Sequence, residues 1–303
     1  MDDPVRTFAD VRVVEIAAKH ALNRVHGMPF RWSLNPYQGC FHQCVFCYAR
    51  ATHAYRELDG VTQWGSALRV KVNVAAALRD DLRRRSYDGG EIAIGTATDP
   101  YQALEGRYRL MPAVLSVLAD ARAPFHITTR STLIVRDLAA LRRCAQRAEV
   151  GVAVSIATLD VALARELEPT VAPPRQRLRA VRALADAGIR VGVAVAPVLP
   201  GITDETAALA AVVGAAADAG ASNVWHAALN LSAAPREAYF AFLRRTRPEL
   251  VARYEALFGD RRYLPTAYVR DVAARFRAAA RAARFALPPV LPLDGEGLQT
   301  ALF

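Results

Sequence analysis

The strongest constraint on the fold is a recurring pattern, a short apolar run followed by a stretch with helical spacing of apolar residues. In the clearest helical stretch, Leu178, Val181, Leu184 and Ala185 share one face, and Gly188 ends the helix before the next run. Parallel strands joined by crossover helices require this alternation. The expected strands are Phe30 to Leu34, Glu91 to Gly95, Phe125 to Thr129, Val150 to Ile156, Arg190 to Ala196 and Asn223 to Leu229.

The expected strands are apolar without alternation, as in Ile92-Ala93-Ile94, which is typical of a parallel sheet whose outer face is covered. Eight such units make a full TIM barrel, so the six found here predict an α/β fold with a partial (β/α)6 TIM-like barrel. We predict an N-terminal segment at 1–29, the barrel core at 30–230 and a helical C-terminal extension at 231–303. Catalytic residues of such folds lie just after the strands.

The composition describes a globular chain with an excess of positive charge. Its 303 residues are 53% hydrophobic and 22% charged, and no run approaches the ~18 apolar residues of a membrane span. The first residues, Met1-Asp2-Asp3-Pro4, are acidic where a secretory signal is basic, so we expect a cytoplasmic protein. The net charge of +10 would attract nucleic acid or anionic cofactors, although scattered arginines also describe solvated helix faces. Oligomeric state is not indicated.

Three cysteines, Cys40, Cys44 and Cys47, follow the first expected strand within eight residues. Clustered cysteines without partners elsewhere favour a metal site over a disulfide framework. Three thiolates can hold a four-iron cluster with one iron left open for chemistry. The alternative is a structural zinc site that takes His42 or His53 as its fourth ligand.

The spacing C-x3-C-x2-C, with Phe46 before the last cysteine, resembles the signature of the radical S-adenosylmethionine (SAM) superfamily. The resemblance implies a [4Fe–4S] cluster whose open iron binds the amino and carboxylate groups of SAM. It also implies a one-electron reductant such as flavodoxin or ferredoxin. Reductive cleavage of SAM then gives a 5′-deoxyadenosyl radical that abstracts hydrogen from a substrate.

Further segments narrow this resemblance to uncharacterised radical SAM proteins described as relatives of spore photoproduct lyase. The similar segments are Asn35 to Cys40, Cys47 to Arg50, Gly95 to Gln102, Thr129 to Ser131, Leu167 to Pro169 and Ala196 to Gly201.

The resemblance assigns the binding of SAM to side chains that follow the expected strands. Thr98 and Asp99 would bind the amino group, although both also suit a capping turn. Arg130 would bind the carboxylate with its planar guanidinium, where the lyase family generally has Lys. Ser155 would lie beside the ribose.

Two further regions complete the expected site. The turn from Pro197 to Gly201 would bring backbone groups to the adenine, and Phe46 would pack near the same base. Tyr48 matches a tyrosine of the lyase's radical relay, so it is the candidate catalytic residue. His42 and His53 would contact the cysteine ligands from outside, and a surface or core role is the alternative for both.

One departure from the lyase argues against spore photoproduct repair. The lyase is expected to return hydrogen from a cysteine near the end of the second strand, where this chain has Gly95-Thr96-Ala97. Cys144, alone on a helix, is expected to be a small buried hydrophobe.

We therefore predict a radical SAM enzyme whose favoured substrate is a nucleotide lesion or modified nucleic acid. A peptide or a small metabolite is the alternative substrate. From the cysteines and charge alone, the rival is a zinc-stabilised, non-catalytic nucleic-acid-binding protein. That rival leaves the polar and glycine motifs after the strands unexplained.

Overall fold

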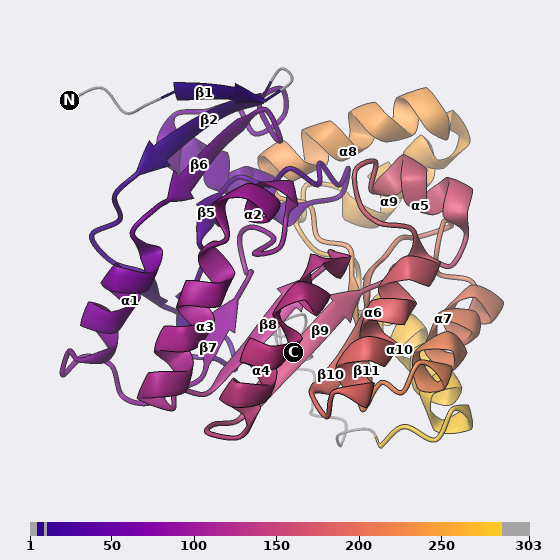
Figure 1. Ribbon diagram of the computed structural model, residues 1–303. Helices are drawn as coiled ribbons and strands as arrows, with labels where there is room; N and C mark the ends of the chain where they lie inside the picture. The colour runs from indigo at the N-terminus through magenta and orange to yellow at the C-terminus, as the bar shows by residue number, and fades with distance from the viewer. Residues whose placement is uncertain (1–4, 9–10, 287–303) are drawn as a thin grey trace.

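The computed structural model describes residues 5–8 and 11–286, and all six expected strands are present (Figure 1). Within these residues a seven-stranded sheet has the order β11-β10-β9-β8-β7-β4-β3, parallel throughout except that β3 pairs antiparallel with β4. The fold is a partial TIM-like barrel. Its strands are β3 (Leu22–Arg24), β4 (Trp32–Leu34), β7 (Ile92–Ile94), β8 (Phe125–Thr129), β9 (Val150–Ser155), β10 (Arg190–Val198) and β11 (Asn223–Ala228).

Helices cover the outer face of this curved sheet (Figure 1). The helix predicted before the fifth strand is α6, with Pro174 in its first turn and Gly188, at φ 75°, just beyond its end. The helices of the barrel are α1 (Val74–Leu82), α2 (Ala103–Tyr108), α3 (Leu110–Ala121), α4 (Leu138–Ala145), α5 (Val161–Leu167), α6 (Pro174–Asp186) and α7 (Thr206–Asp218), with 3-10 helices η1 (Tyr48–Arg56) and η2 (Thr132–Asp137).

The inner face of the sheet is only partly filled. Along β8, Ile127 is buried toward the helices, whereas His126 and Thr128 face the barrel interior and are partly exposed. The neighbouring β9 lines the same space with small or medium-sized residues, Gly151, Val152 and Ala153. A cavity of about 500 Å³ therefore lies inside the barrel near the amino ends of the strands.

A second, four-stranded sheet was not predicted from the sequence. It has the order β1-β2-β6-β5 and joins residues from the expected N-terminal segment to residues after the cysteines. The segment boundaries at 29/30 and 230/231 stay predictions. The strands of this sheet are β1 (Val5–Phe8), β2 (Val11–Ile16), β5 (Tyr37–Gln38) and β6 (Ala67–Lys71).

The described part of the C-terminal extension is helical, as predicted. Its helix α8 packs against η1, and α10 packs against α7 and β11. Aromatic side chains of α8 and α9, including Tyr239 and Phe258, form an apolar cluster with Cys44 and Phe46. The extension therefore buries one side of the cysteine loop. Its elements are α8 (Ala233–Thr246), η3 (Pro248–Leu250), α9 (Val251–Phe258) and α10 (Thr266–Ala282).

The predicted extension also includes residues 287–303, which lie outside the described residues. Within the described ranges, no helix is long and apolar enough to cross a membrane.

Candidate functional site

The three clustered cysteines are free thiols around one small cavity at the carboxyl ends of β7 and β8. Cys40 and Cys44 are buried, and Cys47 is partly exposed. Burial raises the pKa of the Cys44 thiol and raises that of Cys47 to about 11. The cavity measures about 60 Å³ and is also lined by His42, Tyr48, Ala49, Gly95, Thr96, Thr98, Asp99, Thr128, Thr129 and Arg130.

The thiols surround a space rather than a point. In the described part of the chain, no three His, Cys, Asp or Glu side chains converge closely enough to hold a single metal ion. Thiolates are soft ligands, suited to zinc and to iron–sulfur clusters.

Two amide side chains hold the cysteine loop against the loop that follows β7. Gln102, fully buried, accepts a hydrogen bond from the Phe41 backbone N–H (2.7 Å) and donates one to the Thr98 hydroxyl (3.0 Å). Thr98 in turn donates to the Gly39 carbonyl (2.6 Å). Asn35 accepts from the Ala97 N–H at 2.9 Å. The residues of the motifs quoted from the sequence thus bind one another.

Glycine is required at two positions beside the cavity. Gly39 has φ 80°, and a Cβ there would lie 2.7 Å from Leu68 Cδ2. Gly95 has φ 94°, and its Cβ would lie 2.5 Å from the Thr128 carbonyl oxygen. Both conformations disfavour a side chain. Position 95 therefore has no room for the cysteine that the lyase is expected to carry nearby.

The Asp99 carboxylate holds together the loops around the cavity by hydrogen bonds. Its carboxylate accepts hydrogen bonds from the Thr129 hydroxyl (2.7 Å), the Arg130 N–H (2.7 Å) and the Tyr101 N–H (2.8 Å). The Nδ1 atom of His42 lies 3.3 Å from the same carboxylate. Burial favours neutral His42, but the Asp99 charge outweighs it and raises the pKa of His42 to about 10. The capping turn considered as an alternative for Asp99 is present.

Arg130 enters the cavity from the end of β8 and lies within a charged network. Its Nε donates to Glu168 (2.7 Å) and its Nη2 to the Ala196 carbonyl (2.9 Å). Arg177 donates to the other Glu168 oxygen at 2.6 Å. Burial disfavours the Glu168 carboxylate, but the two guanidiniums outweigh this and lower its pKa. Glu168 and Arg177 therefore form a buried internal ion pair.

The two aromatic candidates lie on different sides of the thiols. Phe46 is buried beneath Arg130, whose guanidinium carbon is 5.4 Å from the ring centroid. Tyr48 is 48% exposed, lines the cavity and donates its hydroxyl hydrogen to the Thr96 carbonyl. Tyr48 thus lies between the cavity and solvent.

Like Phe46, four other expected residues do not line the thiol cavity. Ser155 is buried at the end of β9, where its carbonyl accepts from Arg177 at 2.7 Å. Pro197 lies near the end of β10, and Gly201 lies in the turn after it, where its N–H donates to the Asp204 carboxylate. His53 is buried against Trp64, with ring centroids 4.9 Å apart.

Arg50 is a structural residue that sequence reasoning did not single out. It is 8% exposed and donates to the carbonyls of Gly60 (3.1 Å) and Cys44 (3.4 Å). It also lies over the Trp64 ring, 5.8 Å from its centroid. Its place three residues after Cys47, within the quoted motif, was the available signal. Cys144, by contrast, is buried on α4 as expected, with its thiol donating to the Leu115 carbonyl.

Comparison with known proteins gives results that agree with this geometry. The radical SAM superfamily model matches residues 34–212. An uncharacterised protein of Mycobacterium tuberculosis is 42% identical over 264 residues, 86% of this chain and 78% of that protein. An uncharacterised protein of Methanocaldococcus jannaschii is 26% identical over 194 residues, 64% of this chain and 70% of that protein.

Among solved structures, a double mutant of spore photoproduct lyase with bound AdoMet and dinucleoside spore photoproduct is similar in fold. Its TM-score is 0.68 over 89% of this chain and 79% of that chain, at 15% sequence identity.

Proposed function

The chain belongs to the radical SAM superfamily, and from this premise we propose that Cys40, Cys44 and Cys47 hold a [4Fe–4S] cluster with SAM at its open iron. When bound, the cluster and SAM supply a 5′-deoxyadenosyl radical for hydrogen abstraction. The observation that carries the proposal is the cavity at the strand ends that all three free thiols share with Arg130.

The residues present fit this group. In a cluster each thiolate binds a different iron, so thiols placed around a space suit a cluster. No fourth cysteine lines the cavity among the described residues, so one iron would stay open to SAM. The thiol cavity of about 60 Å³ is smaller than SAM, so SAM would also extend beyond it. Tyr48, which lines this cavity and bonds to the Thr96 carbonyl, would lie at its edge.

The contacts to SAM are proposed residue by residue. Arg130 would hold the SAM carboxylate, since Glu168 and Ala196 already fix the plane of its guanidinium at the cavity wall. Thr98 and Asp99 remain the proposed partners of the amino group. Their side chains already bond to Gly39 and Thr129, so they would act chiefly by shaping the loop. Phe46, Ser155 and the turn from Pro197 to Gly201 would hold the adenosine.

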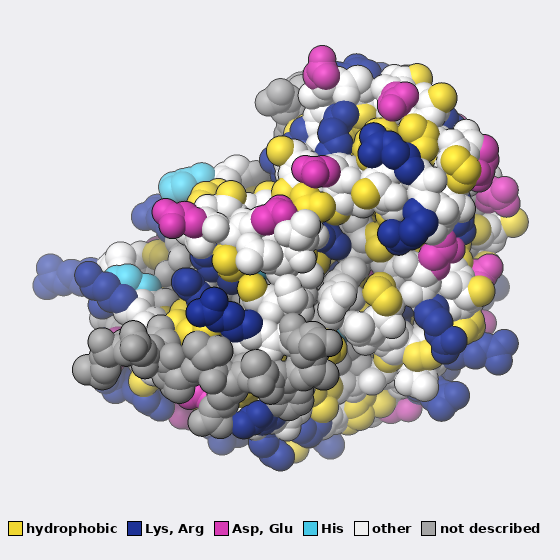
Figure 2. Space-filling model, turned by 90° about the horizontal axis from the view of Figure 1, so that it is seen from above, with side chains coloured by type: hydrophobic (Ala, Val, Ile, Leu, Met, Phe, Trp, Pro, Cys, Tyr) yellow, Lys and Arg dark blue, Asp and Glu magenta, His cyan; other side chains and the backbone are white. Residues whose placement is uncertain are grey.

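The substrate we favour is a modified or damaged nucleotide within nucleic acid. The net charge of +10 and the fold shared with a lyase whose structure holds a dinucleoside spore photoproduct support this choice. Lys and Arg side chains are spread over the face shown in Figure 2 rather than gathered in one patch. We therefore expect modest, strongly salt-dependent affinity for intact DNA.

The deciding experiment is anaerobic reconstitution with iron and sulfide, followed by metal analysis, reduction with dithionite and assay for 5′-deoxyadenosine. We expect about four irons per chain, as the proposed cluster requires, and cleavage of SAM. Cys40→Ala, Cys44→Ala and Cys47→Ala should each lose the cluster, since three ligands leave no spare. Cys144→Ala is the matched control and should keep it.

Other results would overturn the proposal. Stoichiometric zinc without iron uptake would favour the zinc-stabilised binding protein instead. A full cluster in all three cysteine variants would remove the assignment of the ligands.

The role proposed for Tyr48 has its own test. If Tyr48 relays a hydrogen atom, Tyr48→Phe should cleave SAM at the normal rate but change the yield of product per 5′-deoxyadenosine formed. A normal yield with substrate would leave Tyr48 only its hydrogen bond to Thr96.

A further inference from the structure

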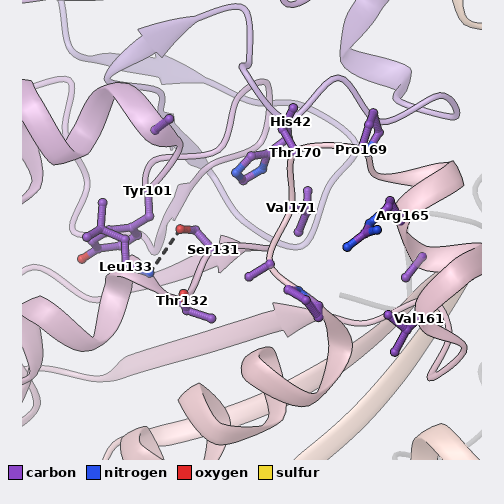
Figure 3. Close-up of a pocket in the computed structure, with 14 residues that line it drawn as sticks. His42, Tyr101, Ser131, Thr132, Leu133, Val161, Arg165, Pro169, Thr170 and Val171 are labelled. Atoms are coloured by element: carbon purple, nitrogen blue, oxygen red, sulfur yellow. Dashed lines mark hydrogen bonds between the residues drawn. The ribbon is translucent and has the colours of Figure 1, made fainter.

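A further cavity lies outside the thiol site and has no role in the function proposed so far. It measures about 530 Å³ and lies at the carboxyl ends of the strands, between the loops after β8 and α5 (Figure 3). We call it the outer hollow. The residues that define it here are His42, Ala103, Ser131, Thr132, Arg165 and Thr170.

The outer hollow and the barrel interior approach the thiols from different sides. Thr128 lines both the thiol cavity and the interior cavity, and we take the barrel interior as the side from which a substrate would reach SAM. His42 lines both the thiol cavity and the outer hollow. A partner in the outer hollow would therefore lie next to the thiols without obstructing the substrate.

The barrier between the outer hollow and the thiols is thin and held in place. His42 is 5% exposed and lies two residues from both Cys40 and Cys44. On the hollow side, the Thr170 hydroxyl donates to the Phe41 carbonyl (2.9 Å). The Val45 N–H donates to the Leu167 carbonyl (3.0 Å). The cysteine loop thus forms part of the wall of the outer hollow, through His42.

The charge of the outer hollow suits an acidic partner. Arg165 lies along its wall (Figure 3), and its side chain is exposed. No carboxylate lines the outer hollow among the described residues, and the chain as a whole carries +10. Opposite charges speed protein encounter and set its orientation.

We propose that the outer hollow is the docking site for an acidic protein that carries one electron. This inference rests on the proposed function, because it supposes a cluster at the thiols. Docking would place the redox group of the carrier against the loop of His42. The carrier would be oxidised by one electron and the cluster reduced by one, with no atom transferred.

The test uses the reconstituted enzyme and two reductants. Flavodoxin, kept reduced by NADPH and its reductase, is the protein probe, and dithionite is the small reductant that needs no docking site. Cluster reduction is followed by stopped-flow absorbance, and flavodoxin binding by surface plasmon resonance at low and high salt.

Two variants probe the outer hollow and a third serves as control. Arg165→Glu reverses its charge, and Ala103→Trp places a bulky ring at an exposed position of its lining. Arg85→Glu makes the same charge change at an exposed position before β7, at the amino end of the strands.

We expect Arg165→Glu to weaken flavodoxin binding and slow reduction by about tenfold at low salt, with the difference shrinking at high salt. Ala103→Trp should slow flavodoxin at both salt concentrations. Both variants should react normally with dithionite, and Arg85→Glu should resemble the wild type with either reductant.

The possible failures are distinct. If dithionite neither reduces the wild type nor supports SAM cleavage, the proposed function fails. If dithionite works and flavodoxin reduces Arg165→Glu and Ala103→Trp as fast as the wild type, the docking site is wrong. If the variants lose affinity for DNA and not for flavodoxin, the outer hollow is a nucleic-acid contact.

Discussion

The carboxylate of Glu168 lies 2.7 Å from Nε of Arg130, and this ion pair joins the end of α5 to the loop after β8. Arg177, from α6, holds the second oxygen of Glu168 at 2.6 Å. Arg130 in turn covers the ring of Phe46 in the cysteine loop. One buried carboxylate therefore fixes three segments around the candidate site.

Glu168→Ala should lower the free energy of unfolding by about 3–5 kcal/mol, because it leaves two guanidiniums without their buried counter-charge. Urea denaturation followed by circular dichroism measures the loss. The matched control is Glu166→Ala, which removes a partly exposed pair with Arg247 at 2.7 Å and should cost less than about 1 kcal/mol. Equal losses in the two variants would contradict the importance of burial.

Gly39→Ala should be far more damaging than Gly89→Ala. Both glycines have positive φ, 80° and 75°, so each alanine incurs the left-handed backbone cost of about 1–2 kcal/mol. At Gly39 the new Cβ would also lie 2.7 Å from Leu68 Cδ2, whereas nothing lies within 4 Å at Gly89. Denaturation of the two variants, with iron content after reconstitution, separates the steric effect. Similar behaviour would show that the wall around Gly39 yields easily.

The barrel could be predicted from the sequence because its strands are locally encoded. Runs such as Val150–Ser155 are apolar up to their last residue, and the helices between them keep one apolar face. The second sheet could not be predicted in this way. Its β5 has two residues, and its β2 pairs with β6 more than fifty residues away, as in Arg12 with Ala67. Such pairing depends on tertiary packing that no local pattern records.

The sequence predicted which residues belong to the candidate site better than it predicted the hydrogen bonds between them. The three cysteines and the expected residues Thr98, Asp99 and Arg130 line the cavity, whereas Ser155 does not. The sequence did not show that the carboxylate of Asp99 would be bonded by Thr129 and backbone N–H groups. Nor did it show the roles of Gln102 and Arg50. Their partners come from other loops or from backbone carbonyls, which have no sequence signature.

Arg50→Met should weaken the cysteine loop without touching a thiol. The variant removes the buried donor to the carbonyls of Cys44 and Gly60, which should lower the free energy of unfolding by about 2–3 kcal/mol. Less iron should stay bound after reconstitution and gel filtration. Arg50→Lys keeps the positive charge but lacks the planar guanidinium, so its stability and iron content should lie between those of the wild type and Arg50→Met. Wild-type iron content in Arg50→Met would show that the loop holds its shape without this residue.

Acid should destabilise the fold through His226, a buried histidine of β11 whose ring centroid lies 4.5 Å from that of Phe276. Burial, aided by the charge of Arg277, lowers the pKa of His226 to about 4, against about 6.5 in an unfolded chain.

Between these two pKa values the unfolded chain binds the proton of this histidine and the folded chain does not, so stability falls as the pH drops from about 6.5 to about 4. The contribution of His226 to this loss reaches about 3 kcal/mol at the acid end.

His226→Phe keeps an aromatic ring against Phe276 and removes the titration. The free energy of unfolding of this variant should therefore fall less steeply with decreasing pH, by up to about 1.4 kcal/mol per pH unit. Urea denaturation of both proteins at pH 7.5, 6 and 5 measures the difference. His53, whose pKa burial also lowers to about 4, titrates in both proteins and cancels in the comparison. Parallel pH profiles would mean that the His226 site accepts the proton in the folded state.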